Sequence, residues 1–178
     1  MKQSTVILLC LLCIVTGIAL GYLIPDTMPV LDIHKKGASV LVLSCIDPRF
    51  IESLSFHLMH NKQVGHDYDL FTLAGASLGV QWNEKWKEAF FDHVRIAINI
   101  HNIKEIWCVD HLDCGMYKLS LEMESDLDSQ IHAKYLLNLK QLLKAEFPEL
   151  LFRGFVIETD GLLHELVQES VSFSKAAL

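Results

Sequence analysis

The hydrophobic and polar positions of this 178-residue chain alternate between two periods. Short runs rich in Val, Ile and Leu have the length and composition of strands that are buried on both faces. Runs with apolar residues three or four positions apart are typical of helices that bury one face. The first kind of run predicts four strands, at 39–44, 69–73, 105–110 and 151–157.

The helical period predicts three helices between these strands. The first has an apolar stripe of Ile51, Leu54, Leu58 and Met59. The second, from about Asn83 to His101, buries Phe90, Val94, Ala97 and Ile98. The third is the most regular, with a stripe of Ile131, Tyr135, Leu139, Leu142 and Leu143. A Thr159-Asp160-Gly161 turn follows the last strand, and the remaining C-terminal segment is compatible with a helix.

Strands that alternate with helices of this length pair in parallel through right-handed crossovers. We therefore expect an α/β fold with a mostly parallel central sheet of four to five strands, flanked by helices on both faces. In such sheets, ligands bind beyond the carboxyl ends of the strands. Cys45 follows the first strand and His111 follows the third, so the sequence places both at that edge.

An uncharged apolar segment, Val6 to Ile24, precedes the predicted domain. Its length suits a membrane-spanning helix, and its composition equally suits a signal peptide. Either interpretation predicts export, so we expect a periplasmic or secreted protein, or one attached to the membrane through residues 6–24. We assign residues 1–24 to this signal peptide or anchor, 25–37 to a linker that contains two prolines, and 38–178 to a single domain.

Composition narrows the class of partner. The formal net charge is −7, and no stretch gathers Lys and Arg as a phosphate-binding surface would. A nucleic-acid partner is therefore not expected. Small molecules and other copies of the chain are the expected partners.

Three side chains at the predicted sheet edge can bind a metal ion: Cys45, His111 and Cys114. Catalytic zinc takes three protein ligands of these types and leaves a fourth position for water. Two alternatives remain open. Cys45 can be an ordinary buried thiol, and in an oxidising compartment Cys45 and Cys114 can form a disulfide. Cys108, inside the third strand, is expected to be a core residue.

Two motifs resemble those of the β-class carbonic anhydrases. They are Cys-x-Asp-x-Arg at 45–49 and His-x-x-Cys-Gly at 111–115, in the family's order and each after a strand. The resemblance covers about residues 38–165. It implies a β-carbonic-anhydrase-like fold, a homodimer or higher homo-oligomer, a Zn²⁺ cofactor, and reversible hydration of carbon dioxide to bicarbonate by a zinc-bound hydroxide.

The resemblance also suggests roles for the neighbouring residues. Asp47 would orient the hydroxide and accept its hydrogen bond, and Arg49 would pair with Asp47 and hold it off the zinc. If that pair opened, Asp47 could become the fourth ligand in a closed state. A substrate pocket is expected at Gly75, Ala76 and Ser77, in the turn after the second strand.

One departure from the family pattern leaves the activity open. Many members have Arg-Asn-Ala-Gly after the second strand, whereas this chain has Thr72-Leu73-Ala74-Gly75 and so lacks both polar residues. The alternatives to carbon dioxide hydration are therefore a non-catalytic zinc-binding module and a hydrolase of a sulfur analogue such as carbonyl sulfide.

Overall fold

The computed structural model describes residues 37–60, 64–65, 67–124 and 128–168. These residues lie within one unit, Lys36–Leu178. The predicted signal peptide or anchor at 1–24 and the linker up to residue 36 fall outside the described residues, so their assignment stays a prediction. None of the described helices is both long enough and apolar enough to cross a membrane.

A five-stranded sheet forms the centre of the fold, in the order β2-β1-β3-β4-β5. Its strands are β1 (Val40–Ser44), β2 (Tyr68–Thr72), β3 (Glu105–His111), β4 (Leu151–Ile157) and β5 (Leu163–Val167). The first four pair in parallel, and β5 pairs antiparallel with β4. The expected mostly parallel α/β sheet is confirmed.

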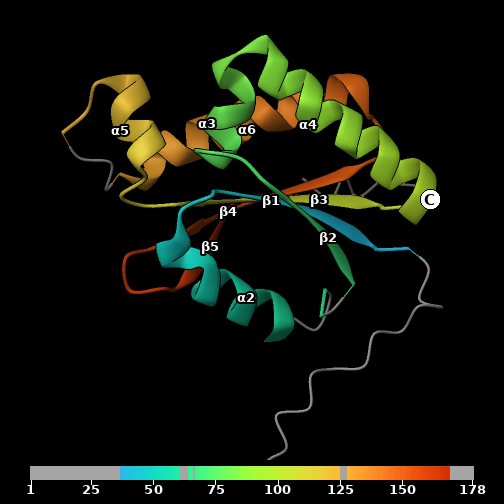
Figure 1. The fold of residues 1–178 in the computed structure, drawn as a ribbon, viewed down its shortest axis with the longest axis horizontal. Coiled ribbons are helices and arrows are strands. Elements are labelled where there is room, and N and C mark those ends of the chain that lie inside the picture. The colour runs from blue at the N-terminus through green and yellow to red at the C-terminus, as the bar shows by residue number, and fades with distance from the viewer. Residues whose placement is uncertain (1–36, 61–63, 66, 125–127, 169–178) are drawn as a thin grey trace, which may run out of the picture. The chain divides into compact units, whose positions relative to one another are not determined.

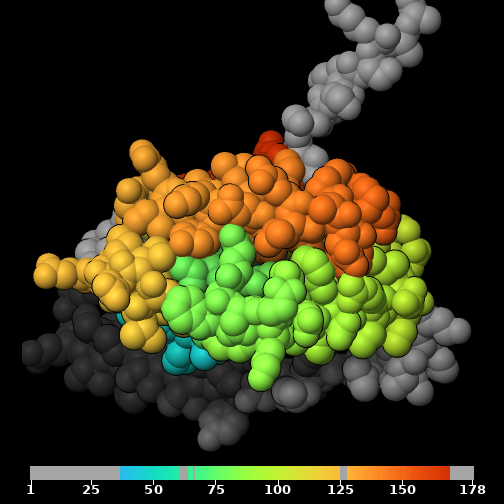
Figure 2. Space-filling view, turned by 90° about the horizontal axis from the view of Figure 1, so that it is seen from above, coloured from blue at the N-terminus to red at the C-terminus, as the bar shows by residue number. Residues whose placement is uncertain are grey.

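Helices cover both faces of this sheet (Figure 1). On one face, a 3-10 turn, η1 (Pro48–Phe50), leads into α2 (Ile51–His60). The other face carries α3 (Ala76–Trp82), α4 (Glu84–Ile96), α5 (Gly115–Leu121) and α6 (Ser129–Glu146). A π-helical turn, η2 (Ala97–His101), continues α4. Figure 2 shows this second face, where α6 lies beside α3 and α4.

Each face of the sheet packs its own apolar cluster because successive strand side chains point to opposite faces. Val40 and Val42 of β1 belong to the cluster with Leu54 and Leu58 of α2. The alternate β1 residues, Leu41 and Leu43, belong to the cluster with α3, α4 and α6. All five residues of β1 are buried, as expected for a strand covered on both sides.

The C-terminal part of the fold differs from the expectation of a helix. Residues Leu163–Val167 form β5, an edge strand that follows the turn at Gly161, where φ is +86°. Only Val167 of this strand is buried. With one exposed edge and a single buried side chain, β5 has little of the buried apolar pattern that marks β1, β3 and β4.

The buried stripe of α6 is rotated from the predicted one. Its buried residues are His132, Leu136, Leu139 and Leu143, whereas Leu142 is exposed. The predicted stripe omitted the buried His132 and also Leu136, which lies one turn further along the same face. The two short helices α3 and α5 were also not predicted, because each has only seven residues.

Candidate metal centre

The carboxyl ends of β1 and β3 bring the three candidate ligands together. The two strands pair in parallel, with Ser44 opposite Val109, so both chains leave the sheet at the same edge. Cys45 follows Ser44 directly, and His111 is the last residue of β3. Cys114 comes three residues later, at the N-cap of α5.

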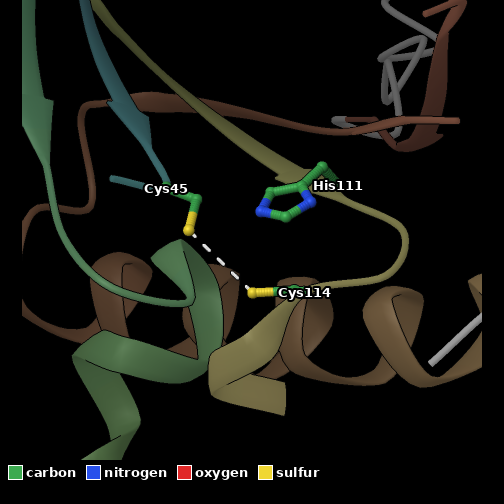
Figure 3. Close-up of side chains that lie close together, drawn as sticks. All are labelled: Cys45, His111 and Cys114. Carbon is green, nitrogen blue, oxygen red and sulfur yellow. Dashed lines mark hydrogen bonds between the residues drawn. The ribbon is translucent and has the colours of Figure 1, made fainter. Parts of the chain in front are cut away.

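The ligand atoms of Cys45, His111 and Cys114 all lie within 4.8 Å of one another. Figure 3 shows both sulfur atoms and the edge of the imidazole facing one shared space. The two Sγ atoms are 3.9 Å apart, well beyond the length of a disulfide bond, about 2.05 Å. No disulfide joins Cys45 and Cys114 in this structure, so the disulfide alternative is not realised here.

His111 is oriented so that one ring nitrogen is available for a metal. Its Nδ1 lies 2.9 Å from the carbonyl oxygen of Leu112 and donates to it, which leaves a lone pair on Nε2. That Nε2 atom is buried and has no hydrogen-bond partner among the described residues. Phe50 stacks on the imidazole with ring centroids 3.9 Å apart and holds its plane. A buried acceptor without a partner is costly unless something binds it, and a metal ion would satisfy it.

The two thiols interact strongly with each other. A hydrogen bond from the Cys114 thiol lowers the pKa of Cys45 to about 4, against the opposing effect of burial. The backbone N–H of Gly75, 3.4 Å from Cys45 Sγ, adds to this stabilisation. The same contact raises the pKa of Cys114, because its proton is shared with the neighbouring thiolate. A divalent cation would displace that proton and hold both sulfurs as thiolates.

This donor set fits zinc. Two thiolates and one neutral imidazole are the ligand types that zinc prefers, and three protein ligands leave one position open. Among the described residues, no other group of His, Cys, Asp or Glu side chains has the proximity of this one. Cys108 is fully buried, as expected for a core residue, and lies outside the group.

Asp47 and Arg49 form a pair beside the three ligands. Asp47 Oδ2 lies 4.0 Å from His111 Nε2. Arg49 donates from Nε to Oδ1 at 3.0 Å and from Nη2 to Oδ2 at 2.7 Å. These hydrogen bonds lower the pKa of Asp47 to about 2, so the carboxylate is ionised at neutral pH. Asp47 also caps η1 by accepting from the Arg49 backbone N–H.

Arg49 has a second anchor on the other loop. Its Nη1 donates to Asp113 Oδ2 at 2.9 Å, and its Nη2 donates to the Asp113 carbonyl oxygen at 2.9 Å. Lys118 donates to the other oxygen of Asp113. Arg49 therefore ties the loop after β1 to the loop after β3, and it is held independently of Asp47.

Two cavities adjoin the site. A small one of about 20 Å³ lies between Phe50, His111 and Asp47. A larger pocket of about 300 Å³ opens beside both cysteines, and apart from them and Asp47 it is lined by Ile46, Pro48, Ala74, Gly115 and Met116. The lining of this larger pocket is mostly apolar, and the pocket extends to the two cysteine ligands.

The turn expected to line a substrate pocket has a different arrangement. Gly75 contributes its backbone N–H to Cys45, but Ala76 and Ser77 are fully buried. Neither lines the two cavities beside the cysteines, and Ala74 takes that position. The Ser77 side chain instead contacts Asp110. Phe50 and Asp110 were not among the predicted site residues, although each is next to one that was.

A family comparison agrees with the site. Residues 35–150 match the model of a family described as "Putative carbonic anhydrase". Two curated relatives, both uncharacterized proteins, come from Rickettsia bellii and Rickettsia conorii. They are 32% and 31% identical over 138 residues, which is 74% of this chain and 83% and 73% of the relatives. The chain therefore belongs to this carbonic anhydrase family.

Solved structures show the same fold. The β-carbonic anhydrase isoform I of Trichomonas vaginalis superposes with a TM-score of 0.55 at 11% identity, over 96% of this chain and 100% of that one. The β-carbonic anhydrase CafA of Aspergillus fumigatus gives a TM-score of 0.51 at 13% identity, over 93% and 91%. The fold is that of a β-carbonic anhydrase, in a divergent member.

Proposed function

We propose that the protein binds Zn²⁺ through Cys45, His111 and Cys114 and catalyses the reversible hydration of carbon dioxide to bicarbonate. The observation that supports this most directly is the convergence of three ligand atoms within 4.8 Å, next to an ionised carboxylate that two loops hold in place. Bound zinc would lower the pKa of a coordinated water from about 15.7 towards about 7 and so supply a nucleophile at neutral pH.

Asp47 orients the water that reacts. An ionised carboxylate only accepts hydrogen bonds, so a water beside Asp47 must point a hydrogen at it and a lone pair elsewhere. Arg49 occupies both oxygens of Asp47 and thereby holds it away from the ligand cluster. Asp113 anchors Arg49 from the opposite loop, and this second anchor helps to keep the Asp47 carboxylate in its position.

The pocket beside the cysteines suits the substrate. Carbon dioxide is small and has no net dipole, and Ile46, Pro48 and Met116 offer it an apolar surface next to Cys45 and Asp47. The pocket reaches the ligand atoms from solvent, so a substrate can approach the water held by Asp47. The missing Arg-Asn pair after β2 does not remove this access, because Ala74 lines the pocket with its small side chain.

Metal analysis and stopped-flow hydration of the full chain test this proposal together. We expect one zinc per chain and carbon dioxide hydration above the buffer rate. Asp47→Ala should lower kcat by about 10- to 100-fold while zinc stays bound. Asp92→Ala is the matched control, because Asp92 is also paired with an arginine, Arg95, but lies on α4. No bound metal would overturn the proposal.

Two outcomes would assign the site to another function. Zinc binding with no hydration in either wild type or Asp47→Ala would support the non-catalytic zinc module. Hydrolysis of carbonyl sulfide without hydration of carbon dioxide would support the sulfur-analogue hydrolase. Both outcomes keep the metal centre and contradict the proposed reaction.

We further propose a homodimer and export, which rest on the sequence and the resemblance. Light scattering of the purified chain should give a mass of two or more copies, and a monomer mass would contradict the dimer. Cell fractionation, with an intact-mass measurement of the N-terminus, tests whether residues 1–24 are cleaved or retained as an anchor. Recovery of the uncleaved chain in the cytoplasm would contradict export.

A further inference from the structure

A buried polar cluster adjoins the metal centre and has no part in the proposed reaction. Its members come from four elements: Asp110 from β3, Ser77 from α3, Tyr117 from α5 and His132 from α6. Their exposed fractions are 1%, 0%, 0% and 0%, respectively. A charged side chain buried this completely is rare unless neighbouring donors satisfy it.

Asp110 is the centre of the cluster. Its Oδ1 accepts from the Ser77 backbone N–H at 3.0 Å. Its Oδ2 accepts from Ser77 Oγ at 2.6 Å and from the Tyr117 hydroxyl at 2.8 Å, and it lies 3.3 Å from His132 Nδ1. Burial and the nearby Asp110 charge raise the pKa of Tyr117, so its hydroxyl keeps the proton that it donates. The carboxylate is thus satisfied by three helices at once.

Two of these partners belong to segments that also build the metal centre. Asp110 itself directly precedes His111. Tyr117 lies in the first turn of α5, whose N-cap is Cys114. Ser77 lies two residues after Gly75, the residue whose backbone N–H points at Cys45 Sγ. The cluster therefore connects the segments around all three ligands. It does so on the face of the sheet that carries α3, α5 and α6 (Figure 1).

The turn between Gly75 and Ser77 needs such support because its backbone is strained. Gly75 has φ +72° and Ala76 has φ +35°, in the left-handed region that alanine rarely adopts. Gly75 is the N-cap of α3 and has no side chain to cap it. The Asp110 carboxylate takes the place of a capping side chain by accepting from the Ser77 backbone N–H.

We propose that Asp110 is a positioning residue for the metal centre. Through Ser77 it fixes the strained turn that aims the Gly75 N–H at Cys45, and through Tyr117 it fixes the first turn of α5 behind Cys114. This inference rests on the proposed metal function. Side chains that orient metal ligands typically change metal affinity or activity by about 10- to 100-fold when they are replaced.

The hydrogen bond on Cys45 gives the inference a spectroscopic signature. An N–H donor withdraws electron density from a thiolate. When the turn shifts and the bond lengthens, the sulfur becomes a stronger donor. In the Co²⁺-substituted protein, the sulfur-to-cobalt charge-transfer band should then move to longer wavelength. A loss of stability alone would leave this band where it is in the folded protein.

The experiment titrates Co²⁺ into the metal-free full chain and measures Zn²⁺ affinity by competition with a chelator. Ser77→Ala and Tyr117→Phe each remove one hydroxyl from Asp110. Tyr135→Phe is the matched control, because its ring packs edge-on against Tyr117 with centroids 5.5 Å apart, outside the Asp110 contacts. We expect a shift to longer wavelength and a zinc Kd about 10- to 100-fold higher in the first two variants, and neither change in the control.

The outcomes separate this inference from the proposed function. If wild type takes up neither Co²⁺ nor Zn²⁺, the metal function fails. If wild type shows the band but folded Ser77→Ala and Tyr117→Phe both match Tyr135→Phe in wavelength and affinity, the positioning role of Asp110 is wrong and the metal centre stands. Both variants remove the 2.8 Å contact between the Ser77 and Tyr117 hydroxyls, and each also removes its own hydrogen bond to Asp110. If only one of them folds, checked by circular dichroism, that variant decides.

Discussion

The Sγ atoms of Cys45 and Cys114 lie 3.9 Å apart, although the two residues leave the sheet on different strands and are 69 positions apart. Neither loop could bring the sulfurs together by itself. The parallel pairing of β1 with β3 sets their separation, and the Gly75 turn places an N–H on one of them. The thiol pair is therefore a product of the tertiary fold.

Metal occupancy should control the reactivity of this pair. With zinc bound, we expect iodoacetamide to label neither Cys45 nor Cys114, and after chelation we expect Cys45 to be labelled, because its thiolate is then free to react, whereas Cys114, whose pKa is raised, keeps its proton. Cys108 is an internal control, since complete burial raises the pKa of its thiol. Peptide mass spectrometry locates the label. Equal labelling of Cys45 in the two samples would contradict a metal at this sulfur.

Arg49 should be required for the catalytic geometry. Without its side chain, Asp47 loses the hydrogen bonds from Nε and Nη2, and the carboxylate becomes free to move towards the ligand cluster. We expect Arg49→Ala to lower kcat by about 10- to 100-fold, and the zinc-loaded variant to show Asp47 as a fourth ligand in a crystal structure.

The control for Arg49→Ala is Arg95→Ala. Arg95 is also half-exposed and bonded to two carboxylates, Asp92 and Glu146, but it lies on α4. An unchanged hydration rate in Arg49→Ala, with an open water position, would refute the role assigned to this arginine.

Asp113→Asn should have a smaller effect than Arg49→Ala. The substitution weakens one anchor of Arg49, but the contact from Nη2 to the backbone carbonyl of Asp113 remains. An exposed ion pair contributes up to about 1 kcal/mol, so we expect kcat to fall by no more than about fivefold. A loss as large as that of Arg49→Ala would show that Asp113 does more than hold the arginine.

The sequence predicted the residues whose positions depend on strand ends. Cys45 and His111 each follow an apolar run, and the rule for parallel sheets places such residues at one edge. The Asp110 cluster could not be predicted in the same way, because its donors come from α3, α5 and α6 and meet only after packing. An Asp directly after the apolar residues 106–109 of β3 was the local signal for it.

The missed elements share a physical cause. A pattern of apolar residues detects only the burial of apolar side chains, whereas α6 also buries His132, whose Nδ1 lies 3.3 Å from Asp110 Oδ2. In β5, the attachment to the sheet comes from backbone pairing and from Glu165 with Arg153, neither of which produces apolar periodicity.

Gly75 should tolerate no side chain. A Cβ at this position would lie 2.7 Å from Cγ and 3.0 Å from Cβ of Met116, on a backbone with φ +72°. Gly65 gives a matched control, because it has φ +52° with nothing within 4 Å of an added Cβ. We expect Gly65→Ala to cost about 1–2 kcal/mol from backbone strain, and Gly75→Ala to cost a further 1–3 kcal/mol, approximately, from overpacking. Equal losses in urea unfolding would contradict the close packing of the turn.

Edge strand β5 should show a pH-dependent attachment to β4. Arg153 donates to Glu165 at 2.7 Å, and this hydrogen bond lowers the pKa of Glu165 in the folded protein. A carboxyl with a lowered folded-state pKa stabilises the fold fully above its unfolded value, about 4.3, and loses that contribution as the pH falls through the folded value.

We expect Glu165→Gln to reduce the free energy of unfolding by about 1–2 kcal/mol at pH 7, with the difference from wild type shrinking below about pH 4. Glu146→Gln is the exposed control, at 46% exposure, and should cost no more than about 0.5 kcal/mol. Urea unfolding of the three proteins between pH 3 and pH 7 measures both terms, and a Glu165→Gln difference that stays constant across this range would show that the ion pair does not hold β5.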